Sequence, residues 1–263
     1  MTAWNPAADL PLTIWRSEPV GDPAADLLEG IRLLERVRDG HAGATLRLYR
    51  PEPTLAFGQR DVRLPGYDAA ASSARELGFA PVVRKAGGRA AAYHRGTLIV
   101  DHVEPASEAM RGHQERFRVL GELYANALGS LGIDAAVGEI PGEYCPGEFS
   151  VHGSPSGPPV AAGPSTSAGP PTSAGPVKLV GTAQRVVAGA WLFASVFVVE
   201  DSAPLRRVLE AVYRDMALSF DPATAGAAED LVPGLTVPDV ERALLEAYAR
   251  HTALVDPHAA AQA

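Results

Sequence analysis

A segment of low complexity limits how this chain can fold. Residues 154–176 contain only Ser, Pro, Gly, Val, Ala and Thr, and "TSAGPPTSAGP" repeats a short unit within them. Such a composition offers too little apolar surface for a packed core and predicts a disordered loop insertion. The sequences on its two sides must then complete one core together. We therefore expect a single domain over residues 10–252, followed by a flexible tail at 253–263.

Composition narrows the class of protein. Hydrophobic residues make up 46% of the 263 residues, enough for a sizeable core. The formal net charge of −8 is spread along the chain, which argues against nucleic acid as the main partner. The first residues lack the basic and apolar regions of a secretory signal, and the longest apolar stretch is too short to cross ~30 Å of hydrocarbon. We expect a cytoplasmic protein with no membrane span.

Periodic patterns predict helices and strands in irregular alternation. Apolar residues three or four positions apart predict helices over residues 23–40, 67–78, 107–132, 205–216 and 238–250. Alternating or β-branched runs predict strands at residues 44–50, 54–58, 134–137 and 148–152, two strands around a Gly-Gly loop in residues 80–103, and long strands from residue 177 onward. Because the order has no regular βαβ repeat, we predict a mixed α/β, or α+β, fold.

The only cysteine, Cys145, lies in the turn-prone sequence "GEYCPGEFSV". A lone cysteine is usually an inert buried residue. In a loop of glycine and proline, however, a thiol contributes little packing, and backbone amides can point at a substrate oxygen. Cys145 is therefore a candidate nucleophile. Its reactivity would require a cation or helix terminus that lowers its pKa, and Lys178, Arg89 and His94 are candidates.

Two glycines separate basic residues in "RKAGGRAAAYH". In one interpretation, Gly87 and Gly88 let the backbone approach a ligand, Arg89 binds an anion or a carbonyl, and His94 handles a proton. In the other, the segment is an ordinary hairpin with solvated charges, and His94 is a hydrogen-bonded structural residue.

The sequence "VKLVGTAQRV" allows a similar pair of interpretations. Lys178 is either an edge residue whose amine reaches solvent or a cation held in a cleft, and Gly181 follows it on the same strand. The seven histidines and the single cysteine show no metal-ligand spacing, and neither GxxxxGK[ST] nor GxGxxG occurs. We expect no metal site.

Four motifs in this order resemble the biotin/lipoate protein ligase superfamily: "RLYRPEPTLAFGQRD", "VVRKAGGRAAAYHRGTLIV", "GEYCPGEFSVHG" and "VKLVGTAQRV". Within it they look most like the cysteine-dependent octanoyl and lipoyl transferases, which are relatives of lipoate-protein ligase A. The resemblance implies a fold like the catalytic domain of biotin protein ligase, which is similar to class II aminoacyl-tRNA synthetases. In that fold a mainly antiparallel sheet carries helices on its outer face.

The resemblance also implies a chemistry. Cys145 would take an octanoyl or lipoyl group as a thioester, while Lys178 contacts the acyl carbonyl. The acyl chain would lie in a tunnel, and the implied substrate-binding residues are Arg84, Gly87, Gly88, Arg89, His94 and Gly181. Implied partners are an acyl carrier protein or the glycine-cleavage H protein as donor, and a lysine of a lipoyl domain or H protein as acceptor. No cofactor is needed, and relatives of this kind are often monomers.

Two other functions stay open at this point. An ATP-dependent lipoate-protein ligase would use ATP and Mg and would not need Cys145. A non-catalytic family member would bind an acyl chain or a lipoyl domain without turnover.

Overall fold

A computed structural model describes residues 11–155 and 175–257 of the chain. Most of the predicted loop insertion therefore lies outside the described residues, and so do residues 258–263 of the predicted tail. The two ends of the insertion are described, and they belong to neighbouring strands of one sheet. The sequences on both sides of the insertion thus contribute to the same sheet.

In the described part of the chain, eight strands form the main sheet, in the order β11–β1–β2–β6–β10–β9–β8–β7. They are β1 (Leu12–Arg16), β2 (Thr45–Tyr49), β6 (Thr97–Ala106), β7 (Ile133–Val137), β8 (Val151–Pro155), β9 (Val177–Val187), β10 (Gly189–Val198) and β11 (Leu254–Val255). Strand β1 runs parallel to β11 and β2, and the other neighbours are antiparallel. The mixed, mainly antiparallel sheet implied by the resemblance is confirmed.

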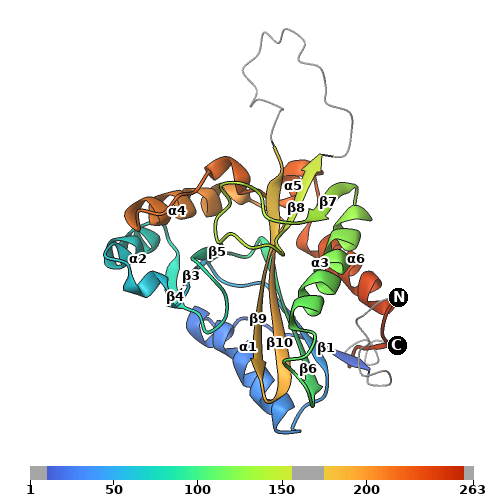
Figure 1. Ribbon diagram of the computed structural model, residues 1–263. Helices are drawn as coiled ribbons and strands as arrows, with labels where there is room; N and C mark the ends of the chain where they lie inside the picture. Colours follow the sequence, from blue (N-terminus) through green and yellow to red (C-terminus); the bar gives the residue numbers. More distant parts are fainter. Residues whose placement is uncertain (1–10, 156–174, 258–263) are drawn as a thin grey trace.

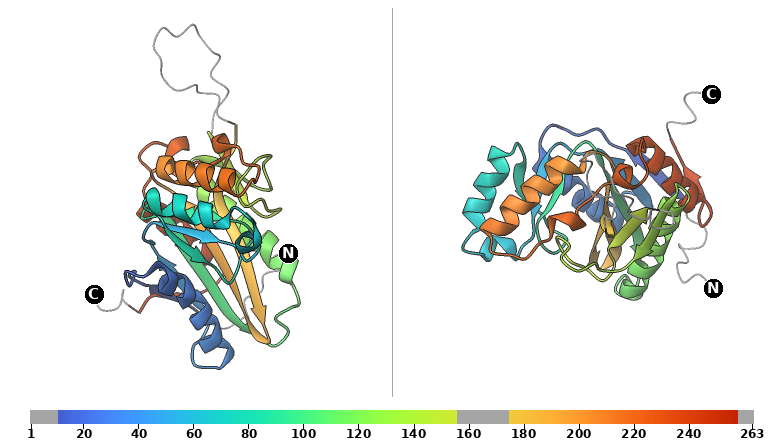
Figure 2. Two further views of the ribbon diagram at one scale, coloured as in Figure 1. Left: turned by 90° about the vertical axis from the view of Figure 1, so that its left-hand side faces the viewer. Right: turned by 90° about the horizontal axis from the view of Figure 1, so that it is seen from above.

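Helices cover both faces of this sheet (Figure 1). Helices α3 (His113–Gly129) and α6 (Val237–Ala249) pack on one face over the largest apolar cluster, and α1 (Pro23–Arg38) packs on the other. A smaller sheet in the order β4–β3–β5 lies beside the main one under α2 (Tyr67–Glu76) and α4 (Ser202–Asp215), as Figure 2 also shows. Its strands are β3 (Thr54–Phe57), β4 (Ala80–Val83) and β5 (Ala91–Tyr93), and the short helix α5 (Ala228–Leu231) precedes α6.

Local sequence explains why helix α1 forms where it does. The Asp22 side chain accepts a hydrogen bond from the backbone N–H of Ala24 at 3.0 Å, so it caps the helix that Pro23 begins. Leu33, Leu34 and Val37 then lie on one face of the helix and pack against the sheet. This agrees with the predicted helix at residues 23–40.

Three predicted boundaries were wrong. The helix predicted from residue 107 begins only at His113, because Gly112 has a left-handed backbone (φ +75°) that interrupts the helical path. The strand predicted at 148–152 is β8, which begins at Val151 and continues to Pro155, so residues 154 and 155 of the predicted insertion belong to a strand. The tail predicted to be flexible from residue 253 begins with β11, whose Leu254 pairs with Leu12. The last two boundaries depend on pairing between strands from separate segments, which a local sequence pattern cannot reveal.

Among the described residues, no helix combines the length and the apolar character that crossing a lipid bilayer requires.

Candidate active site

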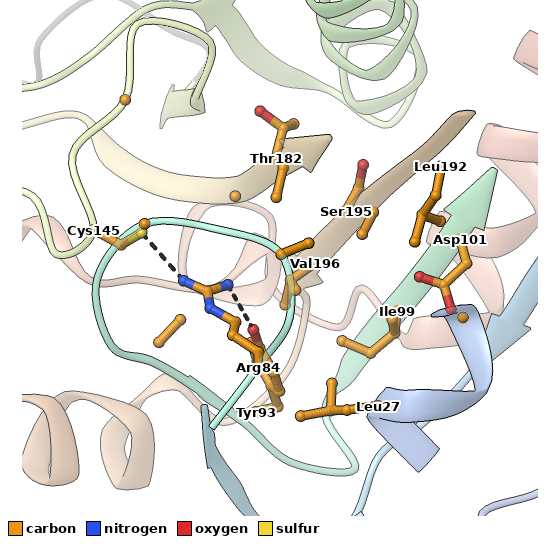
Figure 3. A pocket seen from close by; sticks show the side chains of 18 of the residues that line it. Leu27, Arg84, Tyr93, Ile99, Asp101, Cys145, Thr182, Leu192, Ser195 and Val196 are labelled. Carbon is orange, nitrogen blue, oxygen red and sulfur yellow. Dashed lines mark hydrogen bonds between the residues drawn. The ribbon is translucent and has the colours of Figure 1, made fainter. Parts of the chain in front are cut away.

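A pocket of about 150 Å³ lies between the main sheet and helix α1 (Figure 3). Its floor consists of two rows of side chains that cross the strands in register. One row contains Gly181, Val196, Ile99 and Tyr49, and the next contains Ala183, Ala194 and Asp101. Helix α1 contributes Leu27, Gly30 and Ile31 to the lining. The small residues of both rows leave the space that a slender apolar chain would occupy.

Cys145 lies at one end of this pocket, in the loop between β7 and β8. Its backbone is left-handed (φ +44°), an unfavourable conformation for a residue with a Cβ atom. The backbone N–H of Cys145 donates a hydrogen bond of 2.6 Å to the hydroxyl of Tyr213 on α4. That hydroxyl donates in turn to the carbonyl oxygen of Ala90 at 3.0 Å. Tyr213 thus holds the cysteine loop against the loop that precedes β5.

Two donors contact the sulfur of Cys145. Arg84 Nη2 lies 3.4 Å from Sγ, and the backbone N of Arg89 lies 3.2 Å from it. Burial raises the pKa of the Cys145 thiol, but the positive charges of Arg84 and Lys178 and the Arg89 N–H outweigh burial, so the pKa is lowered. The site therefore favours the thiolate, which is the nucleophilic form of cysteine.

The ammonium group of Lys178 anchors the cysteine loop through three hydrogen bonds. Its Nζ donates to Glu143 Oε1 at 3.2 Å and to the carbonyl oxygens of Tyr144 and Cys145 at 3.0 and 2.8 Å. An ammonium group has three N–H donors, so these three acceptors engage all of them. The side chain is 2% exposed, which rules out the interpretation of Lys178 as an edge residue that reaches solvent. Lys178 thus binds the backbone of Cys145, and the cation that contacts Sγ directly is Arg84. The contact between Lys178 and an acyl carbonyl, which the resemblance implied, stays a prediction.

The Gly-Gly loop is not a hairpin, because β4 and β5 do not pair with each other and both pair with β3. Gly87 has a φ of +111°, and a Cβ atom there would lie 2.6 Å from the guanidinium carbon of Arg84. A Cβ atom on Gly88 would lie 3.3 Å from Sγ of Cys145. The predicted close approach of the backbone therefore occurs, and it brings the loop against Arg84 and the thiol.

Two side chains predicted to bind substrate are engaged elsewhere. The guanidinium of Arg89 pairs with buried Asp61, with Nη1 and Oδ1 3.1 Å apart, and only the backbone of Arg89 reaches the thiol. His94 Nε2 lies 2.8 Å from the carbonyl oxygen of Asp201, and Nδ1 accepts from the N–H of Gly96 at 2.9 Å. Nδ1 thus holds the β5–β6 turn, and Nε2 joins that turn to Asp201, the residue before α4. Because His94 also does not line the pocket, these contacts favour the second interpretation, in which His94 is structural.

Gly181 lines the pocket on β9, as expected for a residue next to substrate. A Cβ atom there would lie 3.8 Å from Lys178 Cε, an ordinary contact distance, so the backbone does not require glycine at this position.

Sequence reasoning missed Glu143 and Asp101. Glu143 is buried and its Oε1 accepts from Lys178, from Ser150 Oγ at 2.7 Å and from the N–H of Gly147 at 3.0 Å. Asp101 lines the pocket at the end opposite Cys145; burial raises its pKa, and a hydrogen-bonded arginine opposes that effect. A carboxylate inside the apolar run "TLIVDHV" was a usable signal, because a strand rarely buries one without a function or a partner.

Replacing Arg84 by methionine is expected to raise the pKa of Cys145, because the variant removes a positive charge and a hydrogen bond from the thiolate. The pH at which alkylation by iodoacetamide becomes fast should then be higher than in the wild type. Near neutral pH the variant should react about tenfold more slowly than the wild type for each unit of pKa shift. Arg118→Met, on the exposed face of α3, is the matched control and should keep the wild-type profile. Superimposable profiles for Arg84→Met and wild type would contradict the assignment.

Replacing Gly58 by alanine is expected to destabilise the fold by about 1–3 kcal/mol. A Cβ atom at Gly58 would lie 1.6 Å from the carbonyl oxygen of Gly88, so the Gly-Gly loop must move away from β3 and from the thiol. Gly43→Ala is the control, since a Cβ atom there meets no heavy atom within 4 Å. Urea unfolding and thiol alkylation measure both effects, and equal behaviour of the two variants would refute this packing argument.

Among residues 11–155 and 175–257, no group of three or more His, Cys, Asp or Glu side chains is arranged to hold a metal ion.

The fold and the site together define a class: α/β proteins with a cysteine of lowered pKa at one end of a mainly apolar pocket. The profile of the lipoyl protein ligase A/B catalytic domain matches residues 30–249. Because this match covers most of the chain, the protein belongs to that family. The family assignment predicted from the four motifs is confirmed.

Individual relatives agree with this assignment. The chain is 32% identical over 119 residues to an octanoyl-[GcvH]:protein N-octanoyltransferase of Geobacillus kaustophilus, an alignment that spans 45% of this chain and 42% of the relative. It is 26% identical to a protein of the same name from an Exiguobacterium species, over 75% of this chain and 67% of the relative. The match to the first relative thus spans less than half of that relative's length.

A solved structure confirms the fold. Protein Ta0514 of T. acidophilum with bound lipoic acid superposes with a TM-score of 0.67 over 94% of this chain and 88% of its own length, at 17% identity. At this identity the likeness establishes the architecture and nothing finer.

Proposed function

We propose that this protein transfers an octanoyl or lipoyl group, by way of a thioester on Cys145, to a lysine of an acceptor protein. The observation that carries the proposal is the position of the thiol: its pKa is lowered, and it lies at one end of a pocket lined mainly by apolar residues. A thiolate so placed meets the reactive end of an acyl group whose chain is buried.

The residues around the sulfur suit the acylation step. The thiolate forms a bond to the acyl carbon, and the bond between that carbon and the donor breaks. A thioester donor departs as a thiolate. An amide donor departs as an amine, whose nitrogen takes up from solvent the proton that the Cys145 thiol released. During the attack negative charge moves to the acyl oxygen. Arg84 Nε is buried and has no hydrogen-bond partner among the described residues, so it is an available donor for that oxygen. This keeps Arg84 as the substrate-binding residue predicted from the sequence.

The pocket suits the acyl chain. Leu27, Ile31, Ile99 and Val196 line it and offer aliphatic contacts on the sheet side and the helix side. Each buried methylene contributes about 0.8 kcal/mol, so a medium-length chain supplies several kcal/mol without polar contacts. This energy would orient the carbonyl toward Cys145.

The names of the relatives suggest the partners. These names give octanoyl-[GcvH] as the donor, a protein as the acceptor, and a nitrogen atom as the site that receives the octanoyl group. We propose that this chain likewise takes an acyl group from GcvH or an acyl carrier protein. It then passes the group to a lysine of a lipoyl domain or of GcvH. Exchange of one lysine amide for another through a thioester needs no ATP overall, because the bond broken and the bond made are of the same kind. The cytoplasmic location and the monomeric state stay predictions.

Intact-mass measurement tests the proposal. The protein is incubated with octanoyl-GcvH, octanoyl acyl carrier protein or free lipoate, each with and without ATP and Mg. We expect one octanoyl increment that maps to Cys145 in the absence of ATP, and its transfer to an added lipoyl domain. Strict dependence on ATP would support a lipoate-protein ligase instead, and tight binding of acyl chains without any covalent increment would support a non-catalytic binder.

A further inference from the structure

A buried ion pair lies at the end of the pocket opposite Cys145. Asp101 lies on β6 opposite Arg47 of β2, and Arg47 Nη1 donates to Asp101 Oδ2 at 2.9 Å. The side chains of Arg47 and Asp101 are 2% and 8% exposed. Arg47 also donates to Ser17 Oγ at 2.9 Å and to the carbonyl oxygen of Asp26 at 3.1 Å. Its guanidinium carbon lies 3.9 Å from the centre of the Tyr49 ring. The cation is thus fixed on several sides.

The pocket continues one strand row past this pair. The next residue on the same face of β6 is Val103, and its neighbour Leu192 on β10 also lines the pocket. Helix α1 covers the carboxylate closely, because a Cβ atom on Gly30 would be 2.7 Å from Asp101 Oδ2. An acyl chain that extends from Cys145 along the pocket therefore reaches Asp101 near its distal end (Figure 3).

Asp101 has hydrogen-bonding capacity to spare. Arg47 engages Oδ2, and no described donor reaches Oδ1, although Asp101 lines the pocket. A carboxylate oxygen covered by methylene groups loses its hydration without compensation, whereas a hydroxyl or thiol of the ligand restores a hydrogen bond. The pair thus distinguishes between two kinds of chain end.

We propose that the Asp101–Arg47 pair sets the substrate specificity of the pocket: it favours medium-chain acyl groups that carry a hydrogen-bond donor near the distal end over alkyl chains of the same length. This inference rests on the proposed acyl transfer and names its substrate class. Asp101 and Arg47 are specificity residues here, because the reacting atoms lie at the other end of the pocket.

A matched pair of substrates tests the inference on the wild-type protein. Nonanoyl and 8-hydroxyoctanoyl thioesters of N-acetylcysteamine have equal numbers of heavy atoms and differ in one terminal group. We expect 8-hydroxyoctanoyl to acylate Cys145 at least tenfold faster than nonanoyl. Equal rates, or faster reaction of nonanoyl, would overturn the proposal.

A double variant provides the second test. Asp101→Leu/Arg47→Met removes both charges together and should reverse the preference, so that nonanoyl reacts faster than 8-hydroxyoctanoyl. Ile99→Ala, in the neighbouring row of the floor, widens the pocket without changing its polar end and should retain the wild-type order of the two substrates. An unchanged preference in the double variant, with a fold verified by thermal unfolding, would overturn the proposal.

The substrate specificity and the proposed acyl transfer can be refuted separately. If octanoyl thioesters label Cys145 but the matched pair reacts equally, the specificity proposal is wrong and the acyl transfer stands. If no thioester labels Cys145, the proposed function is wrong. Calorimetric binding of 8-hydroxyoctanoate and nonanoate then decides about the pocket: tighter binding of the hydroxy acid supports the polar end, and equal affinities refute it.

Discussion

Replacement of Cys145 by alanine is expected to lower the rate of acyl transfer by at least roughly a thousandfold, because the variant has no atom that can carry the acyl group between donor and acceptor. The fold should persist. The thiol is only partly buried, and the hydrogen bonds that hold the loop come from the backbone of Cys145 and survive the change. Loss of activity would then report on chemistry rather than on folding.

The measurement is transfer of an octanoyl group from octanoyl-GcvH to a lipoyl domain, followed by mass spectrometry, with thermal unfolding of each variant as the control. Cys145→Ser is the informative comparison. It keeps the size of the side chain, but a serine hydroxyl is far less acidic than a thiol, so Arg84 and Lys178 cannot hold it as an anion at neutral pH. Full transfer by either variant would exclude a cysteine thioester as intermediate.

Replacement of Lys178 by methionine should lower the free energy of unfolding by about 3–5 kcal/mol, because it leaves the buried carboxylate of Glu143 without its cation. The carbonyl oxygens of Tyr144 and Cys145 lose their donor in the same step. For a domain of this size we expect the melting temperature to fall by roughly 10 °C. The thiol should also become less acidic, since Lys178 is one of the charges that lower its pKa.

A double variant separates charge from packing in this case. Glu143→Gln/Lys178→Met removes both charges and should recover part of the lost stability, because no unpaired charge stays buried. Arg118→Ala, which breaks exposed ion pairs with Glu115 and Glu122, should have no measurable effect on the melting temperature. A Lys178→Met protein as stable as the wild type would show that the ammonium group does not anchor the cysteine loop.

Local patterns predicted most helices well. The helix α6 was expected from Thr236, Pro238 and the apolar spacing that follows, and it begins at Val237 with the Thr236 and Asp239 side chains at its start. Such signals act within one or two turns of the chain, and a sequence displays them directly. The start of α3 was missed because Gly112 takes a left-handed conformation that the apolar spacing around it does not reveal.

Some residues of the site could be predicted and others could not, again because a sequence displays only local signals. Cys145 was found because its type and its loop are visible in the sequence, and Lys178 was found through a resemblance. The sequence left two interpretations of His94 open, since one partner of its ring, the carbonyl oxygen of Asp201, lies 107 positions away in the chain. Asp101 was passed over because its partner Arg47 lies 54 positions away and becomes its neighbour only through the pairing of β2 with β6.

The sequence by itself determined the family, the candidate nucleophile, most of the helices and the general α/β class, because each depends on residue types within a short stretch or on the order of such stretches. Only the tertiary structure decided that Arg84 is the cation on the sulfur, that Lys178 anchors the loop, and that Asp101 lies at the end of the pocket opposite Cys145. The physical reason is strand register and loop packing. Arg84 and Cys145 are 61 positions apart, and their contact exists only because two loops from separate parts of the chain pack at the same end of one pocket.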